Sequence, residues 1–415
     1  MSTDDTLRAL EHPLPAGMRD LLPDEAASRR ALARKVLDRF ALHGYALVTP
    51  PAFEFAEVLE RGLGTLDPAE VLRFVEPESG EVAALRPDVT PQIARMIATR
   101  LRDAPPPFRL CYEGTVLRRR SGRAHKHRQI PQVGVELAGV AGPDGDLELL
   151  SVAADALRAA GLAAFKIDVG DAGIVRALLA DVPIAIAEPI SGALARKDDA
   201  ELEDLARTDA AALAHLATLR ALLRLHGGRD ALVEGARVVR GTAAEEAVAR
   251  LTRLFDAATL GGLGAHLSVD LGEVRGFAYY TGPIFHLFAT GPGEALGSGG
   301  RYDDLLRRFG APMPAVGFAL DLDRLSAALR AAGVLLALPE RVVVVGAPDD
   351  PRVAMLRARG TAAIAIRERS AAIAYARAWG FSHLLGDGAA LEELEALEKH
   401  PLGTDVLPPR RVKGV

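Results

Sequence analysis

A strict two-residue alternation runs through residues 132–140, and it constrains the fold more than any other feature of the chain. Successive side chains of a β-strand point to opposite sides, so the apolar residues of this segment share one face. Gln132, Gly134 and Glu136 share the other face. The segment therefore predicts a strand in a sheet with one packed face. Its polar face either meets solvent or lines a pocket, in which Gly134 would leave room for a ligand and Glu136 would present a carboxylate.

Other segments show the periods of helices and strands. A helix is predicted to begin with Thr90 as its N-cap and Pro91 as its first helical residue. The sequence 297–300, Gly-Ser-Gly-Gly, is typical of a hairpin turn. The remaining predicted elements are helices over 24–43 and 321–332 and strands over 46–49, 108–117, 269–271, 277–288 and 315–320.

Two stretches indicate the domain organisation. Residues 172–262 are rich in alanine, leucine and arginine with a helical period, which predicts a helical insertion. After Gly333 short apolar strands alternate with helices, a pattern typical of a small α/β module with parallel strands. A chain of 415 residues is also long enough for two or three domains.

The composition excludes several classes of protein. Hydrophobic residues make up 49% and charged residues 25%, ordinary values that exclude a disordered chain. The single cysteine, Cys111, excludes a disulfide framework and a cysteine-rich zinc site. We expect a cytoplasmic protein without a membrane span, because neither a signal segment nor a long apolar stretch is present. The net charge of -5 argues against nucleic-acid binding.

Basic residues crowd the segment 118–128 between two predicted strands. A solvated loop is the plain interpretation, and recognition of phosphate is the alternative, because guanidinium groups make paired contacts with phosphate. His125 and His127 have no carboxylate or cysteine beside them, so no metal site is expected. Arg275 enters an otherwise apolar strand, where it needs an anionic partner or solvent.

These segments, in their order, resemble the class II aminoacyl-tRNA synthetase core and in particular the histidyl-tRNA synthetase family. The resemblance extends over about residues 16–330. Three segments resemble the class II motifs: the helix, strand and proline up to 51 resemble motif 1, the Leu-Arg pair and basic loop from 117 resemble motif 2, and 317–325 contains motif 3. The other segments that carry the resemblance are Met-Arg-Asp-Leu-Leu-Pro at 18–23, Leu-Arg-Pro-Asp-Val-Thr at 85–90, Arg-Gly-Phe-Ala-Tyr-Tyr-Thr-Gly at 275–282 and Gly-Gly-Arg-Tyr-Asp at 299–303.

The resemblance implies an α+β fold. We expect a class II aminoacyl-tRNA synthetase-like antiparallel sheet with flanking helices, interrupted by the helical insertion at about 172–262. The core is expected to occupy residues 1–330, and a small C-terminal α/β module is expected over 338–415.

The resemblance also implies a site for histidine. In that site acidic and polar groups would bind the α-amino group, an arginine would bind the carboxylate, and Glu136 with Tyr280 would bind the imidazole. Tyr302 would line the pocket. The complete set of expected ligand-binding residues is Asp88, Thr90, Arg118, Gln132, Glu136, Arg275, Tyr279, Tyr280 and Tyr302.

Three positions depart from a synthetase. The motif 2 triplet reads Arg118-Arg119-Arg120 instead of Arg-x-Glu, so a cation that only donates replaces the acceptor for the adenine amino group. Asp321 stands where the family has glycine, and its carboxylate would repel a triphosphate. Ala278 replaces an aspartate in the histidine-specific stretch.

A chain that keeps a histidine pocket and lacks the adenylation chemistry resembles the synthetase paralogues that serve as regulatory subunits of ATP phosphoribosyltransferase, in the first step and feedback regulation of histidine biosynthesis. The resemblance implies no catalytic residue, metal or cofactor in the chain itself. It implies three partners: the short-form catalytic subunit, free L-histidine, and a second copy of the chain in a dimer. An active histidyl-tRNA synthetase and a stand-alone amino-acid-binding protein stay open as alternatives.

Overall fold

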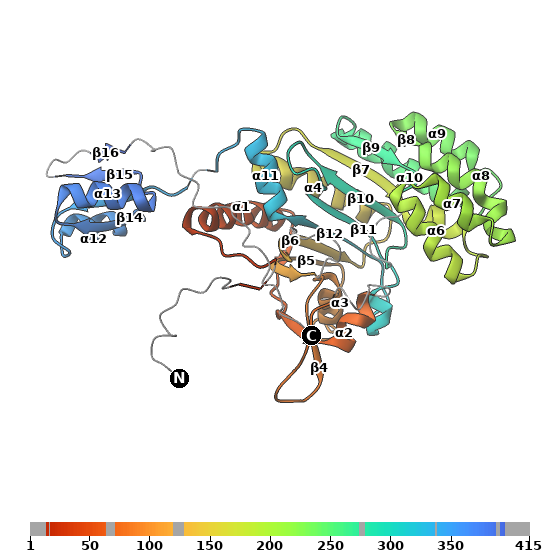
Figure 1. The fold of residues 1–415 in the computed structure, drawn as a ribbon, viewed down its shortest axis with the longest axis horizontal. Helices are drawn as coiled ribbons and strands as arrows, with labels where there is room; N and C mark the ends of the chain where they lie inside the picture. Colours follow the sequence, from red (N-terminus) through yellow and green to blue (C-terminus); the bar gives the residue numbers. More distant parts are fainter. Residues whose placement is uncertain are drawn as a thin grey trace, which may run out of the picture. The chain divides into compact units, whose positions relative to one another are not determined.

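The computed structural model describes residues 14–15, 17–63, 71–118, 128–273, 279–336, 338–386 and 391–394. Residues 32–335 form one compact unit, and the residues outside that range are grouped in a second unit. The larger unit contains the extended sheet and the helical insertion, and the C-terminal α/β module belongs to the other (Figure 1). The expected α+β fold is confirmed, while the domain limits 1–330 and 338–415 stay a prediction.

A nine-stranded sheet forms the centre of the larger unit. Its strands, in spatial order, are β1 (Ala46–Leu47), β5 (Phe108–Leu117), β6 (Gln129–Ala138), β12 (Ala315–Asp321), β11 (Gly297–Arg301), β10 (Pro283–Phe288), β7 (Lys166–Asp171), β9 (Leu267–Asp270) and β8 (His226–Gly227). All neighbours are antiparallel except β1 with β5 and β7 with β9. The sheet is therefore antiparallel at its centre, as expected, with a parallel pair toward each edge.

The apolar face of the predicted 132–140 strand is the packed face of β6. Val133, Val135 and Leu137 are fully buried. Helices α4 (Asp144–Ala160) and α11 (Leu322–Ala331) pack against β12 and β6, and Phe40 of α1 (Pro23–Leu42) meets the ring of Phe318 edge-on. The other face of the sheet carries the cavity described below, next to helix α3 (Thr90–Thr99).

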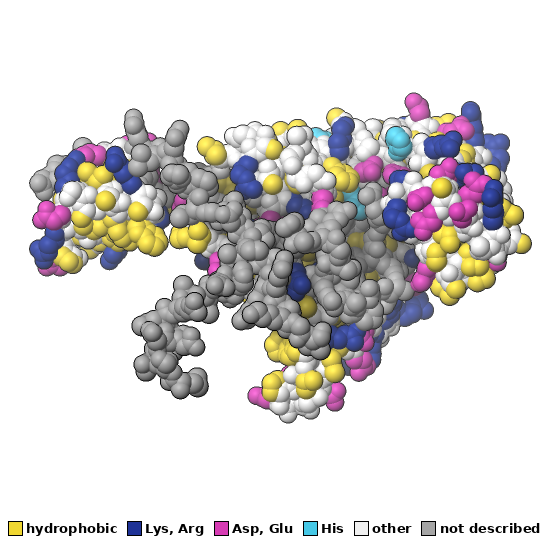
Figure 2. Space-filling model, in the orientation of Figure 1, with side chains coloured by type: hydrophobic (Ala, Val, Ile, Leu, Met, Phe, Trp, Pro, Cys, Tyr) yellow, Lys and Arg dark blue, Asp and Glu magenta, His cyan; other side chains and the backbone are white. Residues whose placement is uncertain are grey.

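Helices are present in the part of the chain where the insertion was expected. They are α5 (Ala172–Leu178), α6 (Ile184–Arg196), α7 (Asp199–Ala206), α8 (Ala210–Arg224), α9 (Arg229–Val238) and α10 (Glu245–Ala258), with the short strand β8 between α8 and α9. Aspartate side chains at 171, 198 and 209 cap three of these helices. Acidic and basic side chains alternate over the exposed surface of the insertion (Figure 2). Ion pairs such as Arg220 with Asp199 and Glu203 join them.

A small three-stranded sheet was not predicted. It pairs β2 (Phe53–Phe55) with β4 (Val82–Leu85) and β4 with β3 (Arg73–Val75), and α2 (Ala56–Leu63) packs against it. Strands of three or four residues are too short to establish an alternation, which explains the omission. Hydrophobic side chains are exposed on this sheet. Phe53 and Phe55 of β2 are each almost half exposed.

The C-terminal module agrees with the predicted alternation of strands and helices. Its elements are β13 (Arg341–Val345), α12 (Pro351–Ala358), β14 (Ala362–Ile366), α13 (Arg369–Trp379), β15 (His383–Leu385) and β16 (Leu391–Glu393). Strand β13 pairs in parallel with β14 and with β15, as expected for strands joined by helical crossovers. The antiparallel strand β16 was not predicted.

The predicted turn at residues 297–300 is wrong, because this segment lies in strand β11. Its glycines allow neighbouring backbone to come close. A Cβ atom on Gly299 would lie 2.4 Å from the carbonyl oxygen of Gly317, and one on Gly297 would lie 2.2 Å from that of Ala319. Glycine is thus required here by close packing between strands, and not by a turn.

The start of one predicted strand also differs from the structure. The strand predicted over 277–288 begins only at Pro283, and Tyr279 and Tyr280 precede it in an irregular segment. Residues 274–278 lie outside the described residues, with Arg275 and Ala278 among them. Among the helices of the described residues, none is both long enough and apolar enough to span a membrane.

Candidate functional site

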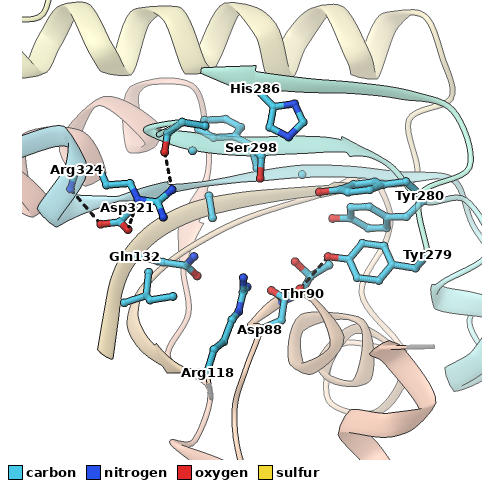
Figure 3. Close-up of a pocket in the computed structure, with 17 residues that line it drawn as sticks. Asp88, Thr90, Arg118, Gln132, Tyr279, Tyr280, His286, Ser298, Asp321 and Arg324 are labelled. Atoms are coloured by element: carbon cyan, nitrogen blue, oxygen red, sulfur yellow. Dashed lines mark hydrogen bonds and ion pairs between the residues drawn. The ribbon is translucent and has the colours of Figure 1, made fainter. Parts of the chain in front are cut away.

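A cavity of about 240 Å³ opens on the polar face of the central sheet (Figure 3). Strand pairing explains its position, because Gln132 lies opposite Asp321 and Ser298 lies opposite His286. The lining residues come from the segment before α3 and the start of α3, from the residue after β5, from β6, β10, β11 and β12 with flanking residues, from α11, and from the irregular segment before β10. They are Asp88, Thr90, Arg118, Ile130, Gln132, Tyr279, Tyr280, His286, Ala295, Gly297, Ser298, Tyr302, Gly317, Phe318, Ala319, Asp321 and Arg324.

The cavity has two chemically different ends (Figure 3). We call the first the tyrosine end, which consists of Asp88, Thr90, Tyr279, Tyr280 and Tyr302, with Glu136 behind Thr90. We call the second the arginine end, which consists of Asp321 and Arg324, with Glu294 beside them. Gln132 and Arg118 lie between the two ends.

The structure brings together most of the residues that the sequence predicted for the site. Asp88, Thr90, Arg118, Gln132, Tyr279, Tyr280 and Tyr302 all line the cavity. Glu136 is buried and bound to Thr90, and Arg275 lies outside the described residues. The polar face of β6 therefore borders a pocket and not open solvent. That these residues bind histidine stays a prediction.

Thr90 has a different role from the predicted N-cap. Val89 occupies the cap position of α3 without a side-chain hydrogen bond, and Thr90 is the first residue of the helix. The Thr90 hydroxyl donates instead to Glu136 Oε1 at 2.6 Å. Asp88 is held from two sides, because Oδ1 accepts from the Thr90 backbone N–H at 3.2 Å and Oδ2 accepts from the Tyr279 hydroxyl at 2.8 Å.

Three buried polar atoms at or near the tyrosine end have no hydrogen-bond partner among the described residues. They are Glu136 Oε2, the Tyr302 hydroxyl and Gln132 Oε1. Glu136 is only 4% exposed and Tyr302 only 3% exposed. Buried polar groups in folded proteins almost always have partners, because an unpaired group costs about 1–3 kcal/mol. This end of the cavity is therefore complementary to a ligand with hydrogen-bonding groups.

The electrostatics of the tyrosine end favour a cation. Burial raises the pKa of the Glu136 carboxyl well above its usual range, the hydrogen bond from Thr90 lowers that pKa, and the nearby Asp88 carboxylate raises it further. Burial makes the ionised form of this carboxyl unfavourable. A positively charged or hydrogen-bond-donating ligand group beside it would stabilise that ionised form. Asp88 adds a second acidic group on the same side.

The tyrosines form an aromatic wall around these acidic groups. The ring of Tyr302 meets that of Tyr279 nearly edge-on, with centroids 5.4 Å apart and an interplanar angle of 83°. Arg176 of the helical insertion donates to the carbonyl of Tyr280, which fixes the segment before β10. Such a wall suits a flat ring with polar edges.

At the arginine end the charged groups satisfy one another. The Arg324 guanidinium pairs with the Glu294 carboxylate, contacts Asp321 Oδ2 through Nε at 3.2 Å, and donates from Nη1 to the Ala295 carbonyl at 2.7 Å. Asp321 Oδ1 also caps α11, accepting from the backbone N–H groups of Asp323 and Arg324 at 2.9 and 3.1 Å. The N-terminus of α11, a position that favours anions, is already occupied by a carboxylate of the chain.

The space beside Gly134 is not available to a ligand, contrary to the prediction. A Cβ atom at Gly134 would lie 2.5 Å from the Tyr112 hydroxyl and 2.7 Å from the Phe318 carbonyl oxygen. Gly134 therefore makes room for the buried Tyr112 ring. Arg118, farther along the same hairpin, donates through Nε to the Pro87 carbonyl at 2.7 Å, next to Asp88.

The sequence did not indicate His286, Ser298, Gly317 or Tyr112 as parts of the site. Ser298 was placed in a turn, and the other three lie on strands whose neighbours become known only from the register. Gly317, for example, faces Glu136 across the β6–β12 pair. Knowledge of the register between paired strands would have identified these residues. That register is known only when the three-dimensional pairing of the strands is known.

The described residues hold no group of three or more histidine, cysteine, aspartate or glutamate side chains that could bind a metal ion. The basic loop 118–128 was predicted either as solvated or as phosphate-binding, and its residues 119–127 lie outside the described residues. Arg120, expected to replace the adenine acceptor, belongs to that segment.

A family model and curated relatives match most of this chain. The family model described as histidyl-tRNA synthetase matches residues 17–325. A relative from Geobacter sulfurreducens named ATP phosphoribosyltransferase regulatory subunit is 37% identical over 93% of this chain and 91% of its own length. A relative of the same name from an Anaeromyxobacter species is 43% identical over 80% of this chain and 97% of its own length.

Two solved structures share the fold. One, described as an ATP phosphoribosyltransferase regulatory subunit/histidyl-tRNA synthetase from Bacillus halodurans, has a TM-score of 0.78 and 27% identity, and the match covers 92% of this chain and 100% of that one. A histidyl-tRNA synthetase from a Nostoc species has a TM-score of 0.72 over 91% of this chain and 92% of its own. Its 22% identity supports similarity of fold alone.

Proposed function

This chain belongs to the ATP phosphoribosyltransferase regulatory subunits of the histidyl-tRNA synthetase family, and we propose that it binds free L-histidine in its cavity and conveys that binding to a catalytic subunit. The observation that carries the proposal is the tyrosine end, where Glu136 Oε2 and the Tyr302 hydroxyl are buried and have no partner among the described residues. Groups in this condition need a ligand or ordered water to offset the cost of their burial.

The groups of the cavity match the groups of histidine one by one. Asp88 and Thr90 offer acceptors for the α-amino group, and Arg118 offers a guanidinium for the α-carboxylate. Glu136 is the acceptor for an imidazole N–H, and Tyr279 with Tyr280 supplies the aromatic wall. Arg275, an expected second partner of the carboxylate, belongs to the proposal on the resemblance alone.

The same cavity is unsuited to adenylation of the amino acid. That reaction requires a nucleotide triphosphate to be held in line with the carboxylate, which is a task of positioning and charge neutralisation. Arg324, the guanidinium at the arginine end, is engaged by Glu294, Asp321 and the Ala295 carbonyl. A phosphate would have to displace two carboxylates to reach it. We therefore propose that the chain has no catalytic activity of its own and needs no cofactor.

The proposed partners are a short-form catalytic ATP phosphoribosyltransferase subunit and a second copy of this chain. The family name supports a complex with a catalytic subunit, and the motif 1 resemblance supports a two-fold dimer, the commonest symmetric assembly. The exposed phenylalanines Phe53 and Phe55 of β2 are apolar surface that such a dimer would bury.

Reconstitution with the catalytic subunit tests this proposal. Mixing should give a larger species on size exclusion, change the rate of phosphoribosyl transfer, and make that rate respond to histidine. The chain alone should show no histidine-dependent exchange of pyrophosphate into ATP. Robust exchange would favour an active synthetase, and two separate peaks with an unchanged transfer rate would leave only a stand-alone amino-acid-binding protein.

A further inference from the structure

Three adjacent strands carry glycines on the face of the sheet that bears the tyrosine end, and of these three glycines Gly317 lines the cavity. Gly134 of β6 makes room for Tyr112, and Gly300 of β11 lies where a Cβ atom would be 2.9 Å from the Tyr280 ring. Gly317 of β12 lies between them in the sheet, because β12 pairs with β6 on one side and with β11 on the other. Because no Cβ atom covers the sheet at these positions, neighbouring side chains approach its backbone more closely than they could over alanine.

Gly317 differs from the other two glycines in the atoms that a Cβ atom at its position would meet. A Cβ atom there would lie 2.0 Å from Glu136 Oε2 and 2.5 Å from the Tyr302 hydroxyl oxygen. These are the same two buried atoms that have no partner among the described residues. Both oxygens thus lie within 2.5 Å of one point, close enough together for a single ligand group to meet both.

We propose that Gly317 determines the ligand specificity of the cavity: the absence of a side chain there lets the Glu136 carboxyl and the Tyr302 hydroxyl stand together and bind one ring N–H group. The inference rests on the proposed function, in that the ring is the imidazole of histidine. It adds a residue whose role is to position two ligand-binding groups, and it defines the recognised feature as an N–H on a small flat ring.

Chemistry selects that feature over other amino-acid side chains. In its ionised form the Glu136 carboxyl only accepts hydrogen bonds, so Oε2 then requires a donor. A phenol donates and accepts, so the Tyr302 hydroxyl can adapt to the same group. A ring of similar shape without an N–H would leave both oxygens buried and unpaired, and sites built for a hydrogen bond reject such analogues strongly.

Substitution of Gly317 should affect recognition more than folding. The atoms that a methyl group would meet are the far ends of two side chains, which can move aside. At Gly299 on β11, by contrast, the nearest atom is the backbone carbonyl oxygen of Gly317, at 2.4 Å, which cannot move without distorting the sheet. Gly317→Ala should therefore fold and lose specificity, whereas Gly299→Ala should lose stability.

Calorimetry with two ligands tests the inference on the full chain. The ligands are L-histidine and thienylalanine, whose five-membered ring carries no N–H. The wild-type chain should prefer histidine by about 100-fold or more, as expected when a site built for a hydrogen bond meets an analogue that lacks it. In Gly317→Ala histidine should bind at least about 50-fold more weakly, and the preference should almost vanish. Gly261→Ala, at a glycine with no atom within 4 Å of its built Cβ, is the matched control and should bind as the wild type does.

A second variant covers the case in which Gly317→Ala does not fold. Tyr302→Phe removes one hydroxyl and adds no atom, and it should weaken histidine binding without weakening thienylalanine binding. Folded Gly317→Ala with wild-type preference, or Tyr302→Phe with unchanged histidine affinity, would overturn the role of this pair. A wild-type chain that binds neither ligand would instead refute the proposed function.

Discussion

The two ends of one cavity differ in whether their polar groups are already paired. At the tyrosine end Glu136 Oε2 and the Tyr302 hydroxyl are buried without a partner among the described residues. At the arginine end Arg324 has three acceptors from the chain itself, Asp321, Glu294 and the Ala295 carbonyl. The first end therefore has buried polar groups that a ligand could meet, while the charged groups of the second end are paired within the chain.

On the proposed function, this difference accounts for a synthetase fold that has lost a reaction and kept a binding site. The sheet, the cavity and the amino-acid end do not need to change. A single acidic residue, Asp321, replaces an anionic ligand at the N-terminus of α11 and pairs with the arginine beside it. Regulation then requires only that histidine binds one state of the complex more tightly than another.

Among changes to a single ligand-binding group, the largest effect is expected from Glu136 at the tyrosine end. Glu136→Ala should weaken histidine binding about 10-fold or more, because a hydrogen bond to a charged group contributes about 1.5–3 kcal/mol. Arg324→Ala, at the other end, should leave the affinity within about 2-fold, since distant sites act almost independently. Isothermal titration of both variants measures the contrast. Equal losses in the two variants would mean that the ends act as one site.

A smaller effect is expected from Tyr302→Phe. Loss of a neutral hydrogen bond of about 0.5–1.5 kcal/mol should weaken histidine binding about 2- to 10-fold. The free chain should be as stable as the wild type or more stable, because the variant removes a buried hydroxyl that has no partner among the described residues. Denaturant unfolding with and without histidine separates the two effects. A variant destabilised equally in both conditions would show that the hydroxyl has a purely structural role.

The raised pKa of Glu136 predicts a pH dependence of stability. The folded chain holds this proton more tightly than the unfolded chain, so its stabilising contribution is present below about pH 4.5 and is lost as the pH rises through the folded pKa. The free energy of unfolding of Glu136→Gln should therefore decline less than that of the wild type between about pH 5 and pH 8. Saturating histidine should reduce the difference, because its imidazole favours the ionised carboxyl. Parallel curves would place the folded pKa near its ordinary value.

The smallest expected effect is a partial reopening of the arginine end. Asp321→Gly combined with Arg120→Glu should improve ATP binding by a few-fold, because one carboxylate leaves Arg324 and one acceptor returns to motif 2. Loss of the Asp321 cap should cost only a few tenths of a kcal/mol, as glycine is tolerated at that position. Fluorescent-nucleotide titration measures the gain. Catalysis is not expected to return, since Ala278 also differs from the synthetases.

The fold could be predicted where elements are long and their periods regular. The strands β5 and β6 run for ten residues each, so both could be located, and the alternation over 132–140 separated the two faces of β6. The small sheet β2–β4–β3 was not predicted, because its strands have only three or four residues. Strand β11 was mistaken for a turn because glycine is typical of turns, and its close contacts with β12 depend on a partner more than fifteen residues away in the chain.

The candidate site could be predicted in part for the same physical reasons. Gln132 and Glu136 share a strand, so spacing alone placed them on one face. His286, Ser298 and Gly317 belong to the cavity through cross-strand neighbours, which spacing along the chain does not encode. The role of Thr90 was misjudged because the same hydroxyl suits a helix cap and a bond to Glu136, and only the fold decides between them.

One calorimetric experiment on the unmodified chain tests both ends at once. The chain is titrated with ATP and magnesium, and the same sample is then titrated with L-histidine. We expect ATP binding that is too weak for calorimetry to detect and a histidine affinity that is the same with and without the nucleotide. Tight ATP binding, or a histidine affinity that rises when ATP is present, would contradict the central claim that the tyrosine end binds its ligand while the arginine end is closed.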